Sequence, residues 1–243
     1  MKQAHKSLLS SLVAFMGVSL TSQAAVTIAY VSSSTTGGFT LSDKTTLPTV
    51  GEISIGFFTG TAPTATDWQN ILQGGVSNAW TSILNLGYKD VRAISGATLG
   101  AGFDPSFATK GSTQGVSIPA TDIGATVQNI PFASLTSGTR MYVMAFNNGS
   151  WDNTSKTATF GTATQFAVVS SWGKTNNAQN FVSPADNGTK SMPFSSAALV
   201  STDVLIGSLN TDTKYVAMIP EPTTSCMFLL GLSCLVAWSR KKN

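Results

Sequence analysis

The central part of this 243-residue sequence contains neither histidine nor cysteine. The single histidine is His5, and the two cysteines are Cys226 and Cys234, so all three lie near the ends of the chain. The region between them lacks the side chains for a Ser-His-Asp triad, a Cys-His pair, a zinc site with the usual nitrogen and sulfur ligands, or a thiol redox centre. We predict no catalytic residues, no metal ligands and no cofactor, and a protein that is not an enzyme. Loop calcium and two-carboxylate catalysis need neither histidine nor cysteine and are considered below.

Charged residues are also scarce, at 10% of the sequence against 42% hydrophobic residues. The formal net charge is +3, but residues 25–219 hold 9 basic and 10 acidic residues, a net charge of −1. The basic excess therefore belongs to the two ends and does not indicate nucleic-acid binding. A surface built from Ser, Thr, Asn and Gln instead of Lys and Glu is unusual for a cytosolic enzyme.

The N-terminal residues follow the order of a secretory signal peptide. Lys2 and Lys6 precede the apolar residues 8–20, and the segment closes on the small-x-small pattern Ser22-Gln23-Ala24. Basic residues, an apolar stretch and a small-residue cleavage site in this order are typical of such a peptide. We predict that residues 1–24 are removed by cleavage between Ala24 and Ala25.

The C-terminal residues indicate a second targeting segment. Pro220-Glu221-Pro222 precedes a polar spacer, the apolar residues 226–238 and the basic stop Arg240, Lys241 and Lys242. The apolar run would form a helix of roughly 20 Å, which is shorter than the ~30 Å hydrocarbon core of a membrane. The basic end would stay on the cytoplasmic side. Because proline fixes φ and lacks a backbone donor, we expect Pro220-Glu221-Pro222 to be extended and to join neither the last strand nor the membrane helix.

This C-terminal order resembles the PEP-CTERM sorting signal of Gram-negative bacteria. The resemblance implies processing by an exosortase, a membrane-embedded cysteine protease or transpeptidase, in bacteria that make exopolysaccharide. It also implies export through the inner membrane, a transient anchor in the membrane, and delivery to the cell surface or extracellular matrix. Cys226 and Cys234 lie within the apolar run, where we interpret them as small apolar helix residues instead of lipidation sites. Residues 52–58, 141–147, 166–172 and 205–208 are similar to an uncharacterised group of PEP-CTERM proteins of about this length, and no activity accompanies that likeness.

Residues 25–219 have the pattern of one mainly β domain. Gly, Pro, Asn and Ser clusters separate the apolar or alternating runs that predict strands. In residues 50–58, Ile53 and Ile55 alternate with Glu52 and Ser54, which predicts a half-exposed strand. Residues 141–146 are apolar on both faces and predict a central strand. The predicted strands are residues 26–31, 50–58, 89–94, 125–130, 141–146, 164–170, 199–206 and 213–219.

A helical period interrupts this pattern at residues 66–86. Apolar residues recur there at three and four positions, Thr66 and Gln69 match a capping box, and Gly74-Gly75 predicts a break into two helices. We expect Trp68 and Trp80 to pack these helices onto a sheet, with ligand contact as the alternative. The whole pattern favours a single β-sandwich, with a jelly-roll as one candidate arrangement, flanked by a signal segment (1–24) and a sorting segment (220–243).

Two loops have the composition of a carbohydrate site. Residues 147–153 and 172–177 each combine a tryptophan, Trp151 or Trp172, with amide side chains. This combination suits the apolar face and hydroxyl rim of a sugar, although loops of secreted proteins also have it without any ligand. Loop calcium bound through Asp104, Asp152 or Asp186 stays open. Asp186-Asn187-Gly188 is best explained as a turn.

We expect an exported, non-catalytic protein of the cell surface or exopolysaccharide matrix, with a structural or adhesive role. A carbohydrate-binding module is the alternative. The third hypothesis is a polysaccharide-active enzyme that uses two carboxylates, since glycoside hydrolysis needs only an Asp or Glu pair. The expected partners are an exosortase, the membrane before processing, and extracellular polysaccharide.

Overall fold

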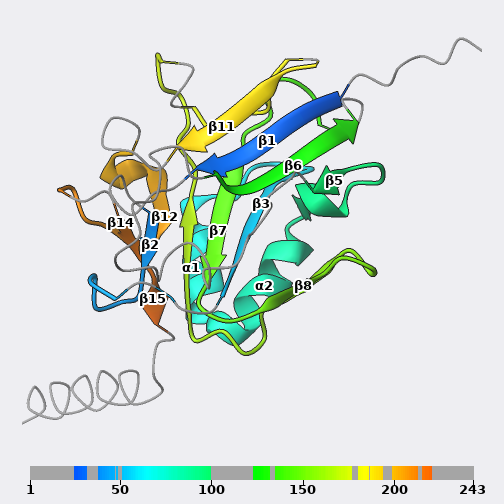
Figure 1. Cartoon of the computed structure of the whole chain (residues 1–243). Coiled ribbons are helices and arrows are strands. Elements are labelled where there is room, and N and C mark those ends of the chain that lie inside the picture. Colours follow the sequence, from blue (N-terminus) through cyan, green and yellow to red (C-terminus); the bar gives the residue numbers. More distant parts are fainter. Residues whose placement is uncertain are drawn as a thin grey trace, which may run out of the picture.

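The computed structural model describes ten parts of the chain (Figure 1). Ala24, Glu221, Pro222 and the basic stop lie outside them, so the predicted signal and sorting segments stay predictions. Within the described parts, neither helix is long and apolar enough to cross a membrane. The described parts are residues 25–31, 38–46, 48, 51–99, 123–131, 135–176, 180–185, 187–193, 199–212 and 215–220.

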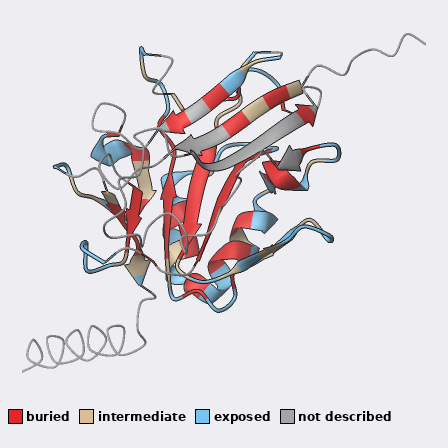
Figure 2. Cartoon of the chain, viewed as in Figure 1, coloured by how far each residue is buried: buried red, intermediate tan, exposed pale blue. Residues whose placement is uncertain are grey.

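The fold is mainly β, as the sequence predicts, and its centre is one antiparallel sheet. β7 lies between β10 and β3, and every residue of β7 is buried (Figure 2). This confirms the central strand predicted from its two apolar faces. In order across the sheet, the strands are β12 (Val204–Ile206), β10 (Gln165–Val169), β7 (Tyr142–Phe146), β3 (Glu52–Phe58) and β4 (Tyr88–Asp90), and β15 (Ile219–Pro220) also pairs with β10.

Two further sheets cover one face of this central sheet. Their side chains share one buried cluster with it, in which Ile28 and Val216 meet Ile55 and Val143. The first sheet has the order β11 (Thr189–Pro193), β1 (Ala25–Val31), β6 (Ile123–Pro131) and β5 (Thr98–Leu99), with β1 parallel to β11 and antiparallel to β6. The second has the order β13 (Ser208–Leu209), β14 (Tyr215–Ala217) and β2 (Gly38–Thr40).

Two helices cover the opposite face. α1 (Ala65–Gln73) and α2 (Val76–Asn85) bury Trp68 and Trp80 against Tyr142 and Phe146 of β7. The expectation that both tryptophans pack the helices onto a sheet is confirmed. The predicted break is also present, because Gly75 adopts a φ of 82° between the helices. β8 (Ser150–Asp152) and β9 (Thr157–Thr159) form a separate two-stranded hairpin in the connection from β7 to β10.

The capping box of α1 lies two residues earlier than predicted. The Thr64 hydroxyl accepts from the Asp67 N–H at 3.3 Å, and the Asp67 carboxylate accepts from the Thr64 N–H at 2.7 Å. An ionised carboxylate interacts more strongly with a helix N-terminus than the neutral amide of Gln69 does. Two threonines with an acceptor three residues later compete in this segment, and the charged pair is the one that forms.

The half-exposed strand predicted at residues 50–58 is wrong, because all of β3 is buried. The helices lie over the face that carries Glu52 and Ser54, and side chains of the neighbouring strand β4 pack beside them, so the exposed fractions are 5% and 0%. Polar groups tolerate such burial only when they have hydrogen-bond partners. Residues from β4 and the following turn supply those partners, as described below.

Three predicted strand ends also differ from the structure. β4 stops at Asp90 because the Asp90 carboxylate caps the short helix η1 (Val91–Ala93) by accepting the Arg92 N–H. Before β12, η4 (Ser201–Asp203) replaces the first part of the strand predicted at 199–206. Pro220 does join a strand, contrary to expectation, because β15 pairs it with Gln165 at the rim of the sheet. A strand edge is where a proline without a backbone donor is tolerated.

Candidate functional site

A cluster of polar side chains is buried on the helix-covered face of the central sheet. Asp90 accepts the Ser54 hydroxyl at 2.7 Å and the Arg92 guanidinium at 2.9 Å through Nε and 2.6 Å through Nη2. The Arg92 Nη1 also donates to Glu52 at 2.5 Å. The side chains of Glu52, Asp90 and Arg92 are 7%, 4% and 2% exposed. We call Glu52, Ser54, Tyr88, Asp90 and Arg92 the polar cluster.

Tyr88 completes the polar cluster, and a glycine makes room for it. Its hydroxyl lies 2.9 Å from Ser54 Oγ. A Cβ on Gly56 would lie 2.5 Å from Tyr88 Cζ, so the ring occupies space that only glycine leaves free. Burial raises the pKa of Tyr88 well above 10, and the neighbouring Asp90 carboxylate adds to this shift. Tyr88 therefore stays neutral at physiological pH and keeps its hydroxyl proton.

Arg92 provides the positive charge of the cluster. Burial acts to lower its pKa, but the Asp90 and Glu52 carboxylates outweigh burial and raise it. Folding thus brings together two carboxylates from residues about 40 positions apart and places one guanidinium between them. Asp90 faces the cavity described below, whereas Glu52 is not in its lining. The two carboxylates are held by Arg92 and do not face each other across an open cleft.

Trp151 of β8 covers the polar cluster. The Arg92 Cζ atom lies 4.0 Å from the centre of the Trp151 ring. The hairpin that carries this tryptophan is fixed by Phe160, which stacks on Phe146 at 4.1 Å and meets Trp80 at 4.7 Å. The Trp151 Nε1 atom is buried and has no hydrogen-bond partner among the described residues.

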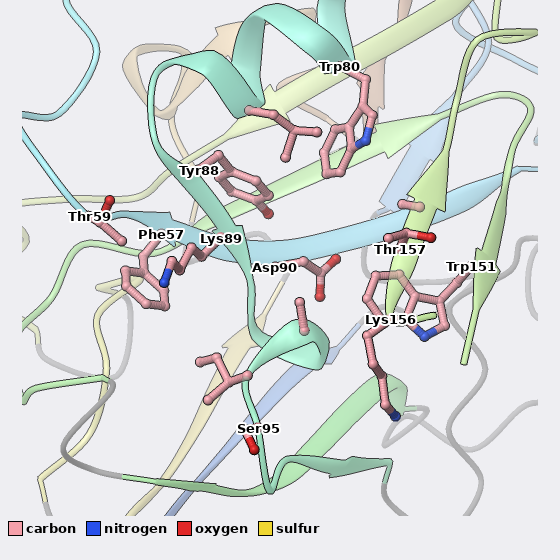
Figure 3. Close-up of a pocket in the computed structure, with 14 residues that line it drawn as sticks. Phe57, Thr59, Trp80, Tyr88, Lys89, Asp90, Ser95, Trp151, Lys156 and Thr157 are labelled. Carbon is pink, nitrogen blue, oxygen red and sulfur yellow. The ribbon is translucent and has the colours of Figure 1, made fainter. Parts of the chain in front are cut away.

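A cavity of about 540 Å³ lies beside Trp151 at the edge of the central sheet (Figure 3). Its volume is within the usual range for small-molecule sites. The cavity continues around edge strand β4, because its lining includes neighbouring residues that point to opposite sheet faces. These include Lys89 on one face and Tyr88 and Asp90 on the other. The lining consists of Phe57, Thr59, Trp80, Leu84, Tyr88, Lys89, Asp90, Ala93, Ile94, Ser95, Trp151, Lys156, Thr157 and Ala158.

The aromatic surface that a ligand can reach belongs mainly to Trp151. Phe57, Trp80 and Tyr88 are each at most 8% exposed, whereas Trp151 is half-buried. Arg92 lies against the ring, the Nε1 edge is buried, and the half-exposed side chain contributes to the cavity lining. The prediction that Trp151 contacts a glycan is therefore geometrically reasonable and stays a prediction.

Trp172 lies apart from this cavity. β7 and β10 are antiparallel, Trp151 follows the end of β7, and Trp172 follows the end of β10. The two tryptophans therefore lie beyond opposite ends of this strand pair. Trp172 is 47% exposed, and the guanidinium of Arg140 lies 5.7 Å from its ring centre and 5.1 Å from that of Tyr142.

The described residues offer little for a metal ion. No group of three or more His, Cys, Asp or Glu side chains comes together in the parts of the chain that the structure covers. Asp152 accepts the Thr154 N–H and the Ser155 hydroxyl, each at 2.8 Å, within the hairpin turn. Asp104 and Asp186 lie outside the described residues.

The turn predicted at Asn187 is present, because Asn187 adopts a φ of 55°.

Sequence reasoning identified Trp151 but missed the other polar residues of the cavity. Lys89 and Asp90 lie in a predicted strand, Lys156 lies between two predicted strands, and no motif connects them. One signal in the sequence indicates the pairing of Glu52 with Arg92. Both are charged residues beside strongly apolar strand positions, and a charged residue that is buried in such a segment is usually paired with an opposite charge.

No family model, curated protein or solved structure matched the chain.

Proposed function

We propose that this chain is an exported, non-catalytic protein of the cell surface or exopolysaccharide matrix that binds a saccharide in the cavity beside β4. The cavity formed by Trp151, Trp80, Tyr88, Lys89 and Asp90 is the observation that carries this proposal. It favours the carbohydrate-binding alternative within the broader surface or matrix role, because a purely structural domain needs no cavity of this size.

The lining has the two kinds of groups that a sugar ring needs. Trp151 offers an aromatic surface for the apolar C–H face of a pyranose ring. The Thr157 and Ser95 hydroxyls and the Lys89 ammonium supply hydrogen-bonding groups around it. The buried Trp151 Nε1 donor lacks a partner among the described residues, and an oxygen acceptor reaching it through a small ring shift would remove that cost of ~1–3 kcal/mol.

The scaffold supports a rigid binding surface. We propose that the central sheet and the β11-β1-β6-β5 sheet form the two layers of one β-sandwich, since their side chains share one core. The helices and the β8-β9 hairpin then lie on the outer face of the central sheet. A site on the edge of a buried sheet is held more firmly than a site on free loops.

A catalytic role has less support. A glycosidase needs two carboxyl groups that both face the sugar. Glu52 and Asp90 are brought together by Arg92, which binds both. Only Asp90 lines the cavity.

Binding by purified protein tests the proposal. We expect a glycan array to identify ligands whose affinity, measured by isothermal titration calorimetry, falls at least ~10-fold in Trp151→Ala. Trp172→Ala is the matched control and should bind like the wild type. Because Trp151 also covers Arg92, Ala93→Trp serves as a second variant that fills the cavity and leaves Trp151 in place. Glycan binding that survives in both cavity variants would refute this site.

Sorting is a separate part of the proposal. A signal peptide cleaved between Ala24 and Ala25 and a Pro220-Glu221-Pro222 motif read by an exosortase would place the domain outside the inner membrane. Glu221→Ala should leave export intact while unprocessed precursor accumulates in the cell envelope, as followed by immunoblotting of cell fractions. Processing at the wild-type rate would show that Glu221 has no recognition role.

A further inference from the structure

We infer that the saccharide bound beside β4 is acidic, a chain of sugars that carries more than one carboxylate. The inference rests on the proposed function and concerns the chemical class of its ligand. Three charged residues line the cavity, namely Lys89, Lys156 and Asp90.

Asp90, the single negative charge of the lining, shares Arg92 with Glu52, so one positive and two negative charges leave the polar cluster with a net charge of −1. Lys89 and Lys156 together outweigh it and leave a net charge of +1 around the cavity. Asp90 accepts hydrogen bonds from Ser54 and from the Arg92 backbone N–H, Nε and Nη2. Both Asp90 oxygens therefore already have donors within the protein, which leaves little capacity to coordinate a cation from the ligand. The polar cluster forms a fixed floor of the cavity, and the lysines are the groups that an anionic ligand would bind.

Neither lysine of the lining forms an ion pair with a described carboxylate. The ion pairs of the described region join Arg92 to Glu52 and Asp90, and Lys174 to Asp203, and none involves Lys89 or Lys156. Lys156 donates to Asn153 Oδ1 at 2.6 Å, and this neutral acceptor leaves the positive charge in place. A ligand anion would therefore meet two available cations.

The positions of the lysines favour a chain with repeated charges. Lys89 projects from β4 toward Phe57, whereas Lys156 extends from the hairpin beneath Trp151, on the other side of Asp90 (Figure 3). Lys89 points to the sheet face opposite that of Asp90, so a saccharide lying across edge strand β4 can place successive carboxylates near the two lysines. The stem of Lys156 and the ring of Trp151 would then contact the apolar face between the charges.

The affinity for such a ligand should depend on salt. Lys89 is exposed, and attraction between exposed charges weakens as the Debye length falls from ~10 Å at 0.1 M salt to ~3 Å at 1 M salt. Lysine provides a point charge without fixed directionality. The site should therefore accept different uronates as long as the carboxylate spacing is similar.

The test compares acidic saccharides with their neutralised forms on the full exported chain. Hexamers of galacturonate and mannuronate are titrated beside the same hexamers with methyl-esterified carboxylates. We expect the acids to bind at least ~10-fold more tightly than the esters in 0.1 M salt, and this preference to shrink in 1 M salt. Lys89→Gln and Lys156→Gln should each weaken binding of the acids about 5-fold, whereas Lys44→Gln, an exposed lysine away from the cavity with the same charge change, should not.

The outcomes separate the inference from the proposed function. If esters or other neutral glycans bound as tightly as the acids, and Trp151→Ala weakened that binding, the inference of an acidic ligand would be wrong. The proposed saccharide binding beside β4 would still hold. Acid binding that Lys44→Gln weakens as much as Lys89→Gln would also overturn it, because the attraction would then be nonspecific. If the exported chain bound no glycan of either kind, the inference and the proposed function would both fail.

Discussion

Arg92 determines whether the buried polar face of the central sheet is stable. Its guanidinium lies between Asp90 and Glu52, and Trp151 covers it. Burying two carboxylates without this cation would leave negative charges uncompensated in a low-dielectric interior. Arg92 also shapes the candidate site, because its hydrogen bonds hold the Asp90 carboxylate in place at the floor of the cavity.

Arg92→Met should therefore be strongly destabilising. Removing one partner of a buried ion pair typically costs ~3–5 kcal/mol of unfolding free energy. Urea denaturation followed by tryptophan fluorescence measures the change. Arg140→Met is the control, because Arg140 is partly exposed and stacks on Tyr142 and Trp172 without a carboxylate partner, so its loss should be smaller. Equal losses in the two variants would contradict this account of the polar cluster.

Tyr88 should make the fold sensitive to alkaline pH. Burial first, and the Asp90 carboxylate second, raise its pKa well above 10 in the folded state. The unfolded chain then releases the phenolic proton before the folded chain does, so the stability is fully present below pH 10 and falls as the pH rises toward the folded pKa.

The variant Tyr88→Phe should flatten this alkaline loss of stability, as measured by urea midpoints between about pH 8 and 11. Some slope should remain, because burial also raises the pKa of Tyr142 and of Tyr215. An unchanged slope would show that Tyr88 ionises freely in the folded protein.

At the scale of secondary-structure elements, local sequence patterns predicted the features that depend on residues close together in the sequence. The two apolar faces of β7 and the spacing of Trp68 and Trp80 in α1 and α2 gave the correct structure. The exposure of β3 could not be predicted, because the partners of Glu52 and Ser54 lie about 36 to 40 positions away in sequence. The same alternation of polar and apolar residues would have fitted a strand facing solvent.

The start of α1 offers a direct comparison of two capping boxes. Thr64→Ala should lower the unfolding free energy by about 1 kcal/mol, because the Asp67 N–H loses its acceptor. Thr66→Ala changes a residue inside the helix and should have little effect or a slight stabilising one. Thermal unfolding followed by circular dichroism measures both. A larger loss of stability for Thr66→Ala would show that Thr66, as the sequence pattern predicts, is the N-cap of α1.

At the scale of the whole molecule, the described domain extends through Pro220. β15 contributes Ile219 and Pro220 to the edge of the central sheet, beside Phe166 and Gln165. A chain containing residues 25–220 should therefore fold, with an unfolding midpoint within about 2 °C of a chain containing residues 25–243.

A chain that ends at Met218 should be less stable, because it lacks β15 and leaves the edge of β10 unpaired at Phe166. Differential scanning calorimetry of the two truncated chains compares them directly. Failure of residues 25–220 to fold would show that the domain needs residues 221–243.

The candidate site is also a property of the whole molecule. Trp151 could be selected from sequence because an aromatic residue among amides suggests a sugar contact, and Trp172 was selected for the same reason. Only the topology shows that they lie beyond opposite ends of β7 and β10. The cavity draws residues from β3, α2, β4, η1 and the hairpin, and no local pattern indicates that these elements meet.

The most direct test of saccharide binding beside β4 is a nuclear magnetic resonance titration of the tryptophan indole N–H signals. The chain has five tryptophans, so the spectrum is simple to assign by substitution. Adding an oligouronate should shift the signals of Trp151 and Trp80, which line the cavity, and leave that of Trp172 unchanged. Shifts confined to Trp172, or no shift at saturating ligand, would contradict the account.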